Sequence, residues 1–439
     1  MATPRTLVTL GDLIEIKHGW PFKSELFSED LTGKPIVVNI GNFRYTGGFR
    51  FDTTTLKEYR GAYPKEYELV PGDILVIMTC QTAGGEILGI PGRIPSDGRT
   101  YLHNQRMGKV VVKCSDAVDP GFLYYLFMSP DLNRELAVTA SGTKILHTSP
   151  SRIEAFGFKL PQASEQRAIA AVLGTLDDKI ELNRRMNETL EATAQAIFRS
   201  WFVDFEPVRA KAAGRKPAGM SAEVAALYPR RLVKSGAKLL PDGWTSKPLD
   251  SIADFLNGLA LQKFPPRGTG DLPVIKIAEL RRGDTEGSDL AGKHVPPEYI
   301  VHDGDVLFSW SGSLEVVIWC GGKGALNQHL FKVTSSKYPK WFYFHWIKEH
   351  LRGFQAIAAA KATTMGHIQR HHLSEALVIV PSEPILKATR TIVEPLVDRV
   401  VANNLESRTL HTLRDTLLPK LLSGEVRVKQ AEKMMEASL

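Results

Sequence analysis

The chain has 439 residues, with 43% hydrophobic and 23% charged residues, which suits a globular protein of about two to four domains. No apolar run approaches the length of a membrane span, the N-terminus lacks a signal-peptide profile, and three scattered cysteines make neither a disulfide framework nor a zinc knuckle, so we expect a cytoplasmic protein. The net charge is +7, but residues 207–240 carry all of it, so the basic pI of about 9.1 is weak evidence for nucleic-acid binding.

The sequence is an internal repeat with a period near half its length. Each copy opens with an apolar segment that ends in Gly19 or Gly258, followed by a Gly-Asp turn and a predicted buried strand. Each copy continues with an Asn-Gln pair, a strand, an aromatic helix, a polar loop, and a strand that ends in Pro161 or Pro381. The separation between copies falls from 239 residues at the glycines to 220 at the prolines.

A long helix follows each copy, and there the separation stays at 220 residues. The apolar residues of the first helix recur at heptad spacing, but Asn183 and Asn187 interrupt the seam, and Asn403 and Ser407 interrupt the second helix at the matching positions. Polar residues in a seam specify register at a cost in stability, so we favour antiparallel packing with the four residues facing one another. The alternative is that each helix packs on its own domain and the asparagines are exposed.

The predicted fold is mixed α/β (α+β), with two pseudo-repeated globular lobes separated by two long antiparallel coiled-coil helices. We place a basic, Pro- and Gly-rich linker between the first helix and the second lobe. The predicted boundaries are a first lobe at 1–161, a central helix at 162–206, a linker at 207–240, a second lobe at 241–380, a C-terminal helix at 381–424 and a tail at 425–439.

Catalytic motifs are missing from the sequence. There is no phosphate-binding Gly-rich loop ending in Gly-Lys-Ser/Thr, and no methyl-donor motif. The stretch "HIQRHH" (His367 to His372) has histidine spacing that could hold zinc on a helix, but no third ligand is nearby, so we interpret it as a polar surface loop. We therefore predict neither catalytic nor metal-binding residues.

These features resemble the specificity subunit of type I restriction-modification systems, over nearly the whole chain. The resemblance is carried by "EQRAIAAVLGTLDDKIELN" in the first helix, "AEVAALYP" and "LPDGW" around the linker, "LNQHLFKV", and "LRDTLLPKLLSGEV" at the second helix end. It implies that each lobe is a target recognition domain that reads one half of a split DNA site, and that the helices set the gap between the halves.

The resemblance also implies partners and cofactors. The partners are double-stranded DNA, two methyltransferase (modification) subunits and two restriction (motor-nuclease) subunits, with no membrane contact. S-adenosylmethionine, ATP and magnesium would be bound by those partner subunits, and no cofactor is expected in this chain.

Base edges are read by Arg, Lys, Asn, Gln, Ser and Thr, so candidate DNA-binding residues are polar residues in loops that match between the copies. Since both lobes share Gln105 and Gln328 but should read different sequences, a structural role is favoured for these two. The candidates are Gln81, Gln105, Arg106, Thr143, Lys144, His147 and Arg152 in the first lobe, and Ser311, Gln328, His329, Lys361, Thr363, Gln369 and Arg370 in the second.

Two other functions remain open from the residues alone. A nuclease or methyltransferase acting alone would require motifs that the sequence lacks. A coiled-coil scaffold or anti-restriction decoy would use the helices to bind partners without its own DNA readout. Such a protein would bind partners independently of salt and would leave no DNA footprint.

Overall fold

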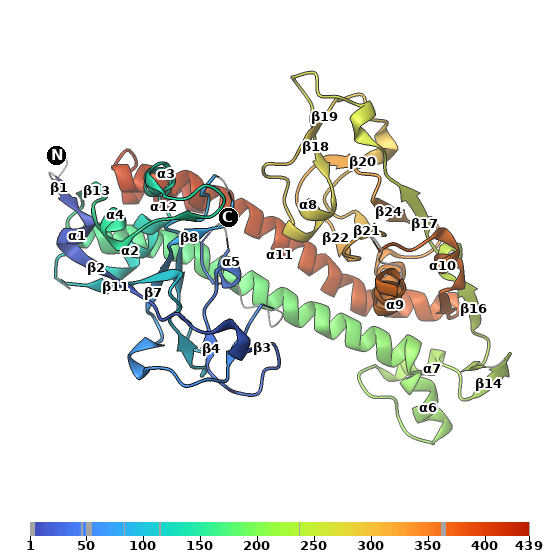
Figure 1. The fold of residues 1–439 in the computed structure, drawn as a ribbon. Helices are drawn as coiled ribbons and strands as arrows, with labels where there is room; N and C mark the ends of the chain where they lie inside the picture. Colours follow the sequence, from blue (N-terminus) through green and yellow to red (C-terminus); the bar gives the residue numbers. More distant parts are fainter. Residues whose placement is uncertain are drawn as a thin grey trace. The chain divides into compact units, whose positions relative to one another are not determined.

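The computed structural model describes residues 5–44, 47–49, 55–82, 84–113, 116–236, 238–360 and 366–438. The chain divides into two compact units, of which the first comprises Met1–Lys179 and Thr409–Leu439 and the second Ile180–Arg408 (Figure 1). Within the described residues, no helix is long and apolar enough to cross a membrane.

The first unit is built on two sheets. One is antiparallel with the order β2-β11-β7-β9, and the other has the order β3-β5-β4-β10-β6, with β4 and β10 parallel. The strands are β1 Thr6–Thr9, β2 Ile14–His18, β3 Phe27–Ser28, β4 Ile36–Val37, β5 Glu58–Tyr59, β6 Glu68–Leu69, β7 Ile74–Ile77, β8 Thr79–Cys80, β9 Pro91–Arg93, β10 Tyr101–Leu102, β11 Met107–Val112, β12 Leu146–His147 and β13 Gly157–Leu160. The short helices are α1 Leu10–Leu13, α2 Pro120–Phe127, α3 Pro130–Thr139, α4 Pro150–Glu154 and α12 Val428–Ser438.

The second unit repeats this plan. Its antiparallel sheet has the order β17-β24-β21-β22, and its other sheet has the order β19-β18-β23-β20, with β18 and β23 parallel. The strands are β14 Leu232–Ser235, β15 Lys238–Pro241, β16 Thr245–Pro248, β17 Asp254–Asn257, β18 Leu272–Ile275, β19 Leu290–Ala291, β20 Ile300–Val301, β21 Val306–Ser309, β22 Val316–Ile318, β23 Gly324–Leu326, β24 Leu330–Thr334 and β25 Leu377–Val380. The matching strand orders show that the repeat in the sequence is a repeat of structure.

Two long helices run through the chain, α5 (Ala163–Phe198, continued by a π-helical turn at Arg199–Val203) and α11 (Glu383–Ser423). In the second unit, the Nδ2 atom of Asn183 donates to Ser407 Oγ at 3.3 Å, while Asn403 Nδ2 donates to Asn187 Oδ1 at 2.8 Å. Residue numbers rise along one helix as they fall along the other, so the predicted antiparallel packing is confirmed.

The four polar residues form a layer between the helices in which the three asparagines are buried and Ser407 is half-buried. Asn183, Asn187 and Asn403 are 0%, 7% and 1% exposed, respectively. Neighbours outside the predicted set contribute, because Asn183 also donates to Glu406 at 2.8 Å and Asn187 to Asn404 at 2.7 Å. The Oδ1 atoms of Asn183 and Asn403 have no hydrogen-bond partner among the described residues. A buried polar layer of this kind disfavours sliding, which would leave more amide groups unpaired.

A charged residue also occupies the predicted seam, in the part of the helix pair that belongs to the first unit. Arg414 is 3% exposed, and its Nη1 atom donates to Asp177 Oδ1 at 2.8 Å. The hydroxyl of Tyr125 in α2 donates to the other oxygen of Asp177 at 2.8 Å, and burial together with the Asp177 charge raises the pKa of Tyr125. The guanidinium therefore keeps its charge in the seam because a carboxylate from the opposite helix pairs with it.

Gln166, part of the Glu-Gln-x-x-Ile-Ala segment, fixes α2 of the first lobe to α5. It is fully buried, its Oε1 atom accepts from the backbone of Asp119 at 2.8 Å, and its Nε2 atom donates to the carbonyls of Ala117 and Pro161 at 3.0 and 2.8 Å. All of these hydrogen bonds of the side-chain amide are made inside the protein, so this position requires a glutamine side chain.

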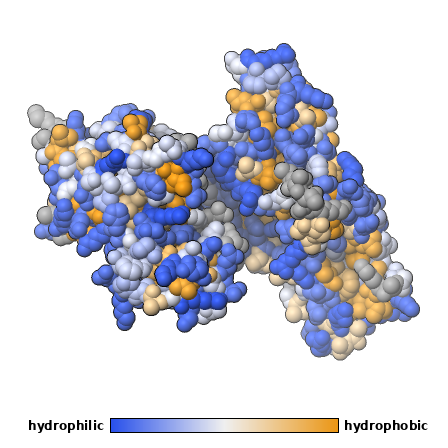
Figure 2. Space-filling view, in the orientation of Figure 1, coloured by the Kyte–Doolittle hydropathy of each residue, from blue (hydrophilic) through white to orange (hydrophobic). Residues whose placement is uncertain are grey.

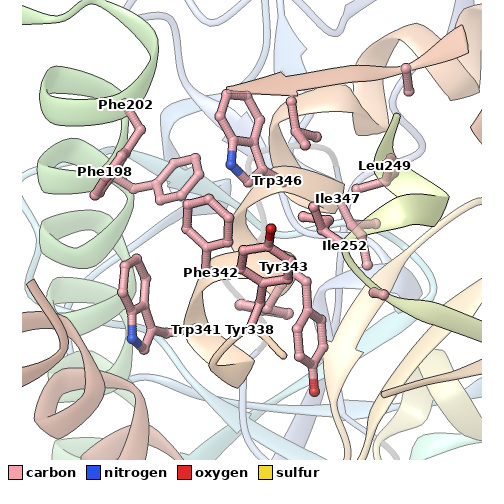
Figure 3. Close-up of a cluster of buried hydrophobic side chains, with 14 of the residues drawn as sticks. Phe198, Phe202, Leu249, Ile252, Tyr338, Trp341, Phe342, Tyr343, Trp346 and Ile347 are labelled. Carbon is pink, nitrogen blue, oxygen red and sulfur yellow. The ribbon is translucent and has the colours of Figure 1, made fainter. Parts of the chain in front are cut away.

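In the second unit, the end of α5 packs on an aromatic helix, α9 (Lys340–Ala360). Figure 3 shows Phe198 of α5 and Phe202 of the π-helical turn pointing toward Phe342 and Trp346 of α9. The ring of Phe198 lies edge-on to Trp346, with centroids 5.2 Å apart, and Phe202 is edge-on to Phe342 at 5.8 Å. Buried aromatic pairs of this kind make a rigid joint between lobe and helix.

His345 lies in this aromatic core, and its burial should make the stability of the second unit depend on pH. It is 2% exposed and stacks on Phe198, and burial lowers its pKa to about 4. As the pH falls below about 6.5, this histidine takes up a proton in the unfolded chain but not yet in the folded chain. The free energy of unfolding should therefore drop by about 3 kcal/mol between pH 6.5 and 4. The contribution of this histidine should be constant above pH 6.5. Denaturant unfolding at several pH values measures the drop.

A His345→Phe variant keeps the ring and removes the titrating group, so it should unfold with a smaller loss of stability toward pH 4. The same substitution at exposed His294 is the matched control. Buried His103 in the first unit, whose pKa is also about 4, remains in both variants. A drop of equal size in His345→Phe and in the parent would contradict the assignment.

The segment 207–240, predicted as a linker, is folded. It contains α6 (Glu206–Ala212), α7 (Ala222–Leu227) and the β14–β15 hairpin, and Val208 and Tyr228 are buried in the aromatic core. Lys211 Nζ donates to the carbonyl of Ala225 at 2.7 Å. The predicted tail likewise contains α12, where Ala431 is fully buried. The visible face of each unit is largely hydrophilic, with separate hydrophobic spots (Figure 2).

Candidate nucleic-acid interface

Three segments of the first lobe meet just after strand β7. The backbone N–H of Met78 donates to the carbonyl of Arg106 at 3.0 Å, and the N–H of Thr148 donates to the carbonyl of Met78 at 3.0 Å. The turn with the Asn-Gln pair and the strand β12 therefore lie on the two sides of Met78. Three of the predicted loops converge here.

The second lobe has the same arrangement after strand β21. The N–H of Trp310 donates to the carbonyl of His329 at 3.3 Å, and the N–H of Ile368 donates to the carbonyl of Trp310 at 3.0 Å. Trp310 thus occupies the place of Met78, and His329 occupies the place of Arg106. The backbone framework is shared, while the side chains on it differ between the lobes.

The Asn-Gln turns are anchored by the residues that follow β2 and β17. Gln105 N–H donates to the carbonyl of Trp20 at 3.0 Å, and Gln328 N–H donates to the carbonyl of Leu259 at 2.9 Å. Asn104 and Asn327 are 7% and 6% exposed, and these asparagines form the bridges to the same two residues.

The structural role expected for the shared glutamine side chains therefore falls to the asparagines that precede them. The side chain of Gln105 is exposed and that of Gln328 is half-buried. Both glutamines stand where a ligand could meet them.

In the first lobe, pairing of β8 with β12 brings most candidates together. Leu146 faces Cys80 and His147 faces Thr79, so the loop before β12 lies beside the residue that follows β8. The exposed residues of this surface, called here the first reading surface, are Gln81, Gln105, Arg106, Thr143, Lys144 and His147. Arg106 and Lys144 carry positive charge, and the others carry hydrogen-bonding groups. Arg152 lies on α4, where its backbone N–H donates to Ser149 Oγ at 3.3 Å.

In the second lobe, the candidates have unequal positions. Gln328 and His329 are half-buried beside Trp310, and Gln369 is exposed at the start of α10 (Arg370–Glu375). We call these three residues the second reading surface. Lys361 and Thr363 lie outside the described residues.

Two further candidates of the second lobe contact other parts of the fold. Ser311 is 3% exposed, so it lies behind the surface. The guanidinium of Arg370 donates to the carbonyl of Phe255 at 3.2 Å and lies 5.8 Å from the centre of the Phe331 ring. Ser311 is therefore covered by the fold in this conformation, whereas Arg370 makes these contacts and remains exposed.

Thr79, Asn104 and Asn327 also support these surfaces, although none of them was predicted from the sequence. Thr79 is 6% exposed, and its Oγ1 atom lies 3.1 Å from Nδ1 of His147. The signal was present in the repeat, since Thr79 and Ser311 are separated by the same 232 residues as the two Gly-Asp turns. The match between Thr79 and Ser311 is hard to see in the sequence because their neighbours, Met78 and Trp310, differ.

The expectation that no third potential metal ligand lies near the histidines of residues 367–372 is wrong. His371, His372 and Glu375 place three potential ligand atoms within 4.8 Å of one another, so a third ligand does exist near the histidines. However, His372 Nδ1 accepts the backbone N–H of Gln369 at 2.9 Å, which caps α10. A neutral imidazole has a single acceptor nitrogen, so a metal on His372 would have to break this cap. The geometry supports a role in starting the helix.

Comparison with known proteins gives concordant matches. The family model of the type I restriction modification DNA specificity domain matches residues 5–192 and 241–408. The chain is 27% identical over 338 residues to the type I restriction enzyme MjaIX specificity subunit of Methanocaldococcus jannaschii, covering 74% of this chain and 73% of that protein. It is 24% identical over 437 residues to the HindI specificity subunit of Haemophilus influenzae, covering 83% of this chain and 95% of that protein.

A solved structure agrees in fold. The S subunit of a type I restriction-modification system from M. genitalium matches with a TM-score of 0.54 at 15% identity, covering 95% of this chain and 96% of that one. At this identity the likeness concerns the fold alone.

Proposed function

Because the chain belongs to the type I restriction modification DNA specificity family, we propose that it reads a bipartite, asymmetric DNA site, one half with each lobe. The observation that carries the proposal is the shared backbone framework after β7 and β21, which presents different side chains in the two lobes. A shared backbone framework that carries different side chains suits the recognition of two half-sites with different sequences. The first reading surface adds the positive charge that phosphate contacts need.

The helix pair is proposed to set the gap between the half-sites. Helices α5 and α11 are 36 and 41 residues long, and the buried polar layer opposes sliding of one helix along the other. Two lobes held in fixed register on such a pair would enter grooves of the duplex a set number of base pairs apart.

Catalysis is proposed to lie in partner subunits. Relatives are named specificity subunits of restriction enzymes, and proteins of this family recognise DNA and assemble with other subunits of such systems. Two methyltransferase subunits would bring S-adenosylmethionine, and two restriction subunits would bring ATP and magnesium. In this proposal the chain itself makes no covalent change in DNA.

The test uses the full chain in complex with its methyltransferase subunits. Methylation of a random DNA library reports both half-sites and the gap at once. Arg106→Ala with Lys144→Ala should weaken binding to all sequences and lower its salt dependence, whereas Gln328→Ala with Gln369→Ala should relax only one half-site. Lys159→Ala, an exposed lysine of β13, is the control for lost charge.

The scaffold or decoy alternative makes the opposite prediction. A chain without its own readout would assemble with its partners, while the complex would methylate without sequence preference or not bind DNA at all. Retention of both half-sites in every reading-surface variant would also reject the proposed surfaces.

A further inference from the structure

We propose that Thr79 and Ser311 are positioning residues that orient the histidines which read DNA, His147 in the first lobe and His329 in the second. The inference rests on the proposed function and deepens it. It assigns one position of the repeat, the first hydroxyl after the central strand, to the control of specificity in both lobes.

The two hydroxyls occupy equivalent places. Thr79 directly follows Met78, and Ser311 directly follows Trp310, which have matching backbone hydrogen bonds. Each is also the cross-strand neighbour of a histidine, since Thr79 pairs with His147 in β12 and Ser311 forms a bridge with His367. Thr79 and Ser311 are 6% and 3% exposed, so each hydroxyl lies beneath the surface and meets the reading residues from inside.

The hydroxyls hold different imidazoles. Thr79 Oγ1 lies 3.1 Å from Nδ1 of its cross-strand neighbour His147. Ser311 Oγ lies 2.9 Å from Nδ1 of His329, which comes from the Asn-Gln turn and occupies the place of Arg106. One buried hydroxyl position therefore supports two different sites for the reading imidazole.

Holding Nδ1 fixes the direction of the other ring nitrogen. A neutral imidazole has one donor and one acceptor nitrogen, so once Nδ1 is paired with the hydroxyl, Nε2 is the remaining nitrogen, which can contact a base edge from His147 and meets the amide of Gln328 in His329. In the second lobe, Nε2 of His329 lies 3.5 Å from Nε2 of Gln328. The hydroxyl there orients a short chain of side chains that ends in an amide, the group that reads adenine with two hydrogen bonds.

Loss of this orientation should reduce discrimination more than affinity, because a freely rotating imidazole still offers hydrogen bonds to wrong bases. A well-placed contact to a base edge discriminates roughly tenfold or more between bases. Thr79→Val keeps the shape of the side chain without the hydroxyl, and Ser311→Ala removes the hydroxyl without adding volume. Thr79→Ser keeps the hydroxyl and is the conservative rescue.

The experiment measures binding of the methyltransferase complex to its own site and to single-base variants of that site. Thr79→Val should lower discrimination about tenfold at a position in one half-site only, Ser311→Ala should do so in the other half-site only, and Thr79→Ser should restore the parent pattern. Thermal unfolding of each variant shows whether the fold is kept.

A double-mutant cycle separates positioning from packing. If Thr79 acts through His147, then Thr79→Val should change nothing further in a His147→Ala background, and likewise Ser311→Ala in His329→Ala. Additive losses, or a loss of stability with unchanged discrimination, would overturn the inference while the proposed function stands. If His147→Ala and His329→Ala leave both half-sites unchanged, the inference fails together with the proposed reading surfaces.

Discussion

Insertion of one heptad into each long helix, after Asn187 and before Asn403, is expected to lengthen the gap in the recognised DNA site and to leave both half-sites unchanged. Seven residues add about 10 Å of helix, which is roughly three base pairs along the duplex. Seven residues also restore the face of a coiled coil, so each lobe keeps its attachment. Methylation of a library with randomised gap lengths measures the shift.

The lengthened site should bind more weakly than the parent site binds the parent protein. Three extra base pairs turn the duplex by about a third of a turn, and the complex must twist the DNA to bring the second half-site back into reach. If the variant prefers the same gap length as the parent protein, the helices do not set the gap.

The position of the insertion supplies the control. Asn187 faces Asn403 and Asn183 faces Ser407, so an insertion after Asn187 and before Asn403 keeps the polar layer together. An insertion of the same length placed after Asn187 and after Ser407 would set the layer's residues opposite inserted residues. That variant should be less stable by about 1–3 kcal/mol per buried amide left unpaired. Equal stability of the two insertions would show that the layer does not fix the register.

Replacing Gly258 by alanine is expected to destabilise the second unit by about 3 kcal/mol and to disturb its reading surface. A Cβ atom there would lie 2.2 Å from the carbonyl oxygen of Asn327 and 2.6 Å from that of Leu326. Because the obstacle is backbone, no side chain can rotate away, and the turn that carries Gln328 and His329 must move. Gly19 in the first unit meets the carbonyl of Asn104 at the same 2.2 Å, so Gly19→Ala should act alike on the first lobe.

Replacing a second glycine of the same unit by alanine should have the opposite effect on stability. Gly353 lies within α9, and a Cβ atom there would meet nothing within 4 Å. Gly353→Ala should therefore stabilise the second unit by up to about 1 kcal/mol through its helix propensity. Denaturant unfolding of both variants, together with the half-site profile of Gly258→Ala, measures the effects. A neutral Gly258→Ala variant with unchanged specificity would contradict the proposed close packing under the turn.

Much of the architecture followed from periodicity along the chain. The heptad seam with polar residues at Asn183, Asn187, Asn403 and Ser407 predicted antiparallel helices, because a register in which these residues meet leaves the fewest buried polar groups unpaired. The repeat predicted two lobes of one fold, since the same order of glycine, turn, strand and Asn-Gln pair specifies the same local structure twice. These are properties of neighbouring residues, which a sequence records directly.

The reading surfaces depended on tertiary structure. The sequence ranked Ser311 with the other polar loop residues, yet packing buries it behind His329. The position of Thr79 under His147 depends on the pairing of β8 with β12, which joins segments far apart in the chain. The linker at 207–240 was predicted from composition, and only long-range contacts of Val208 and Tyr228 with the aromatic core revealed that it is folded.

By itself, the sequence determined the duplicated lobes, the paired helices and their polar layer, because each depends on spacing within a segment or between two copies of one. The tertiary structure alone decided which side chains face outward on the lobes, since that depends on strands and turns far apart in the chain coming together.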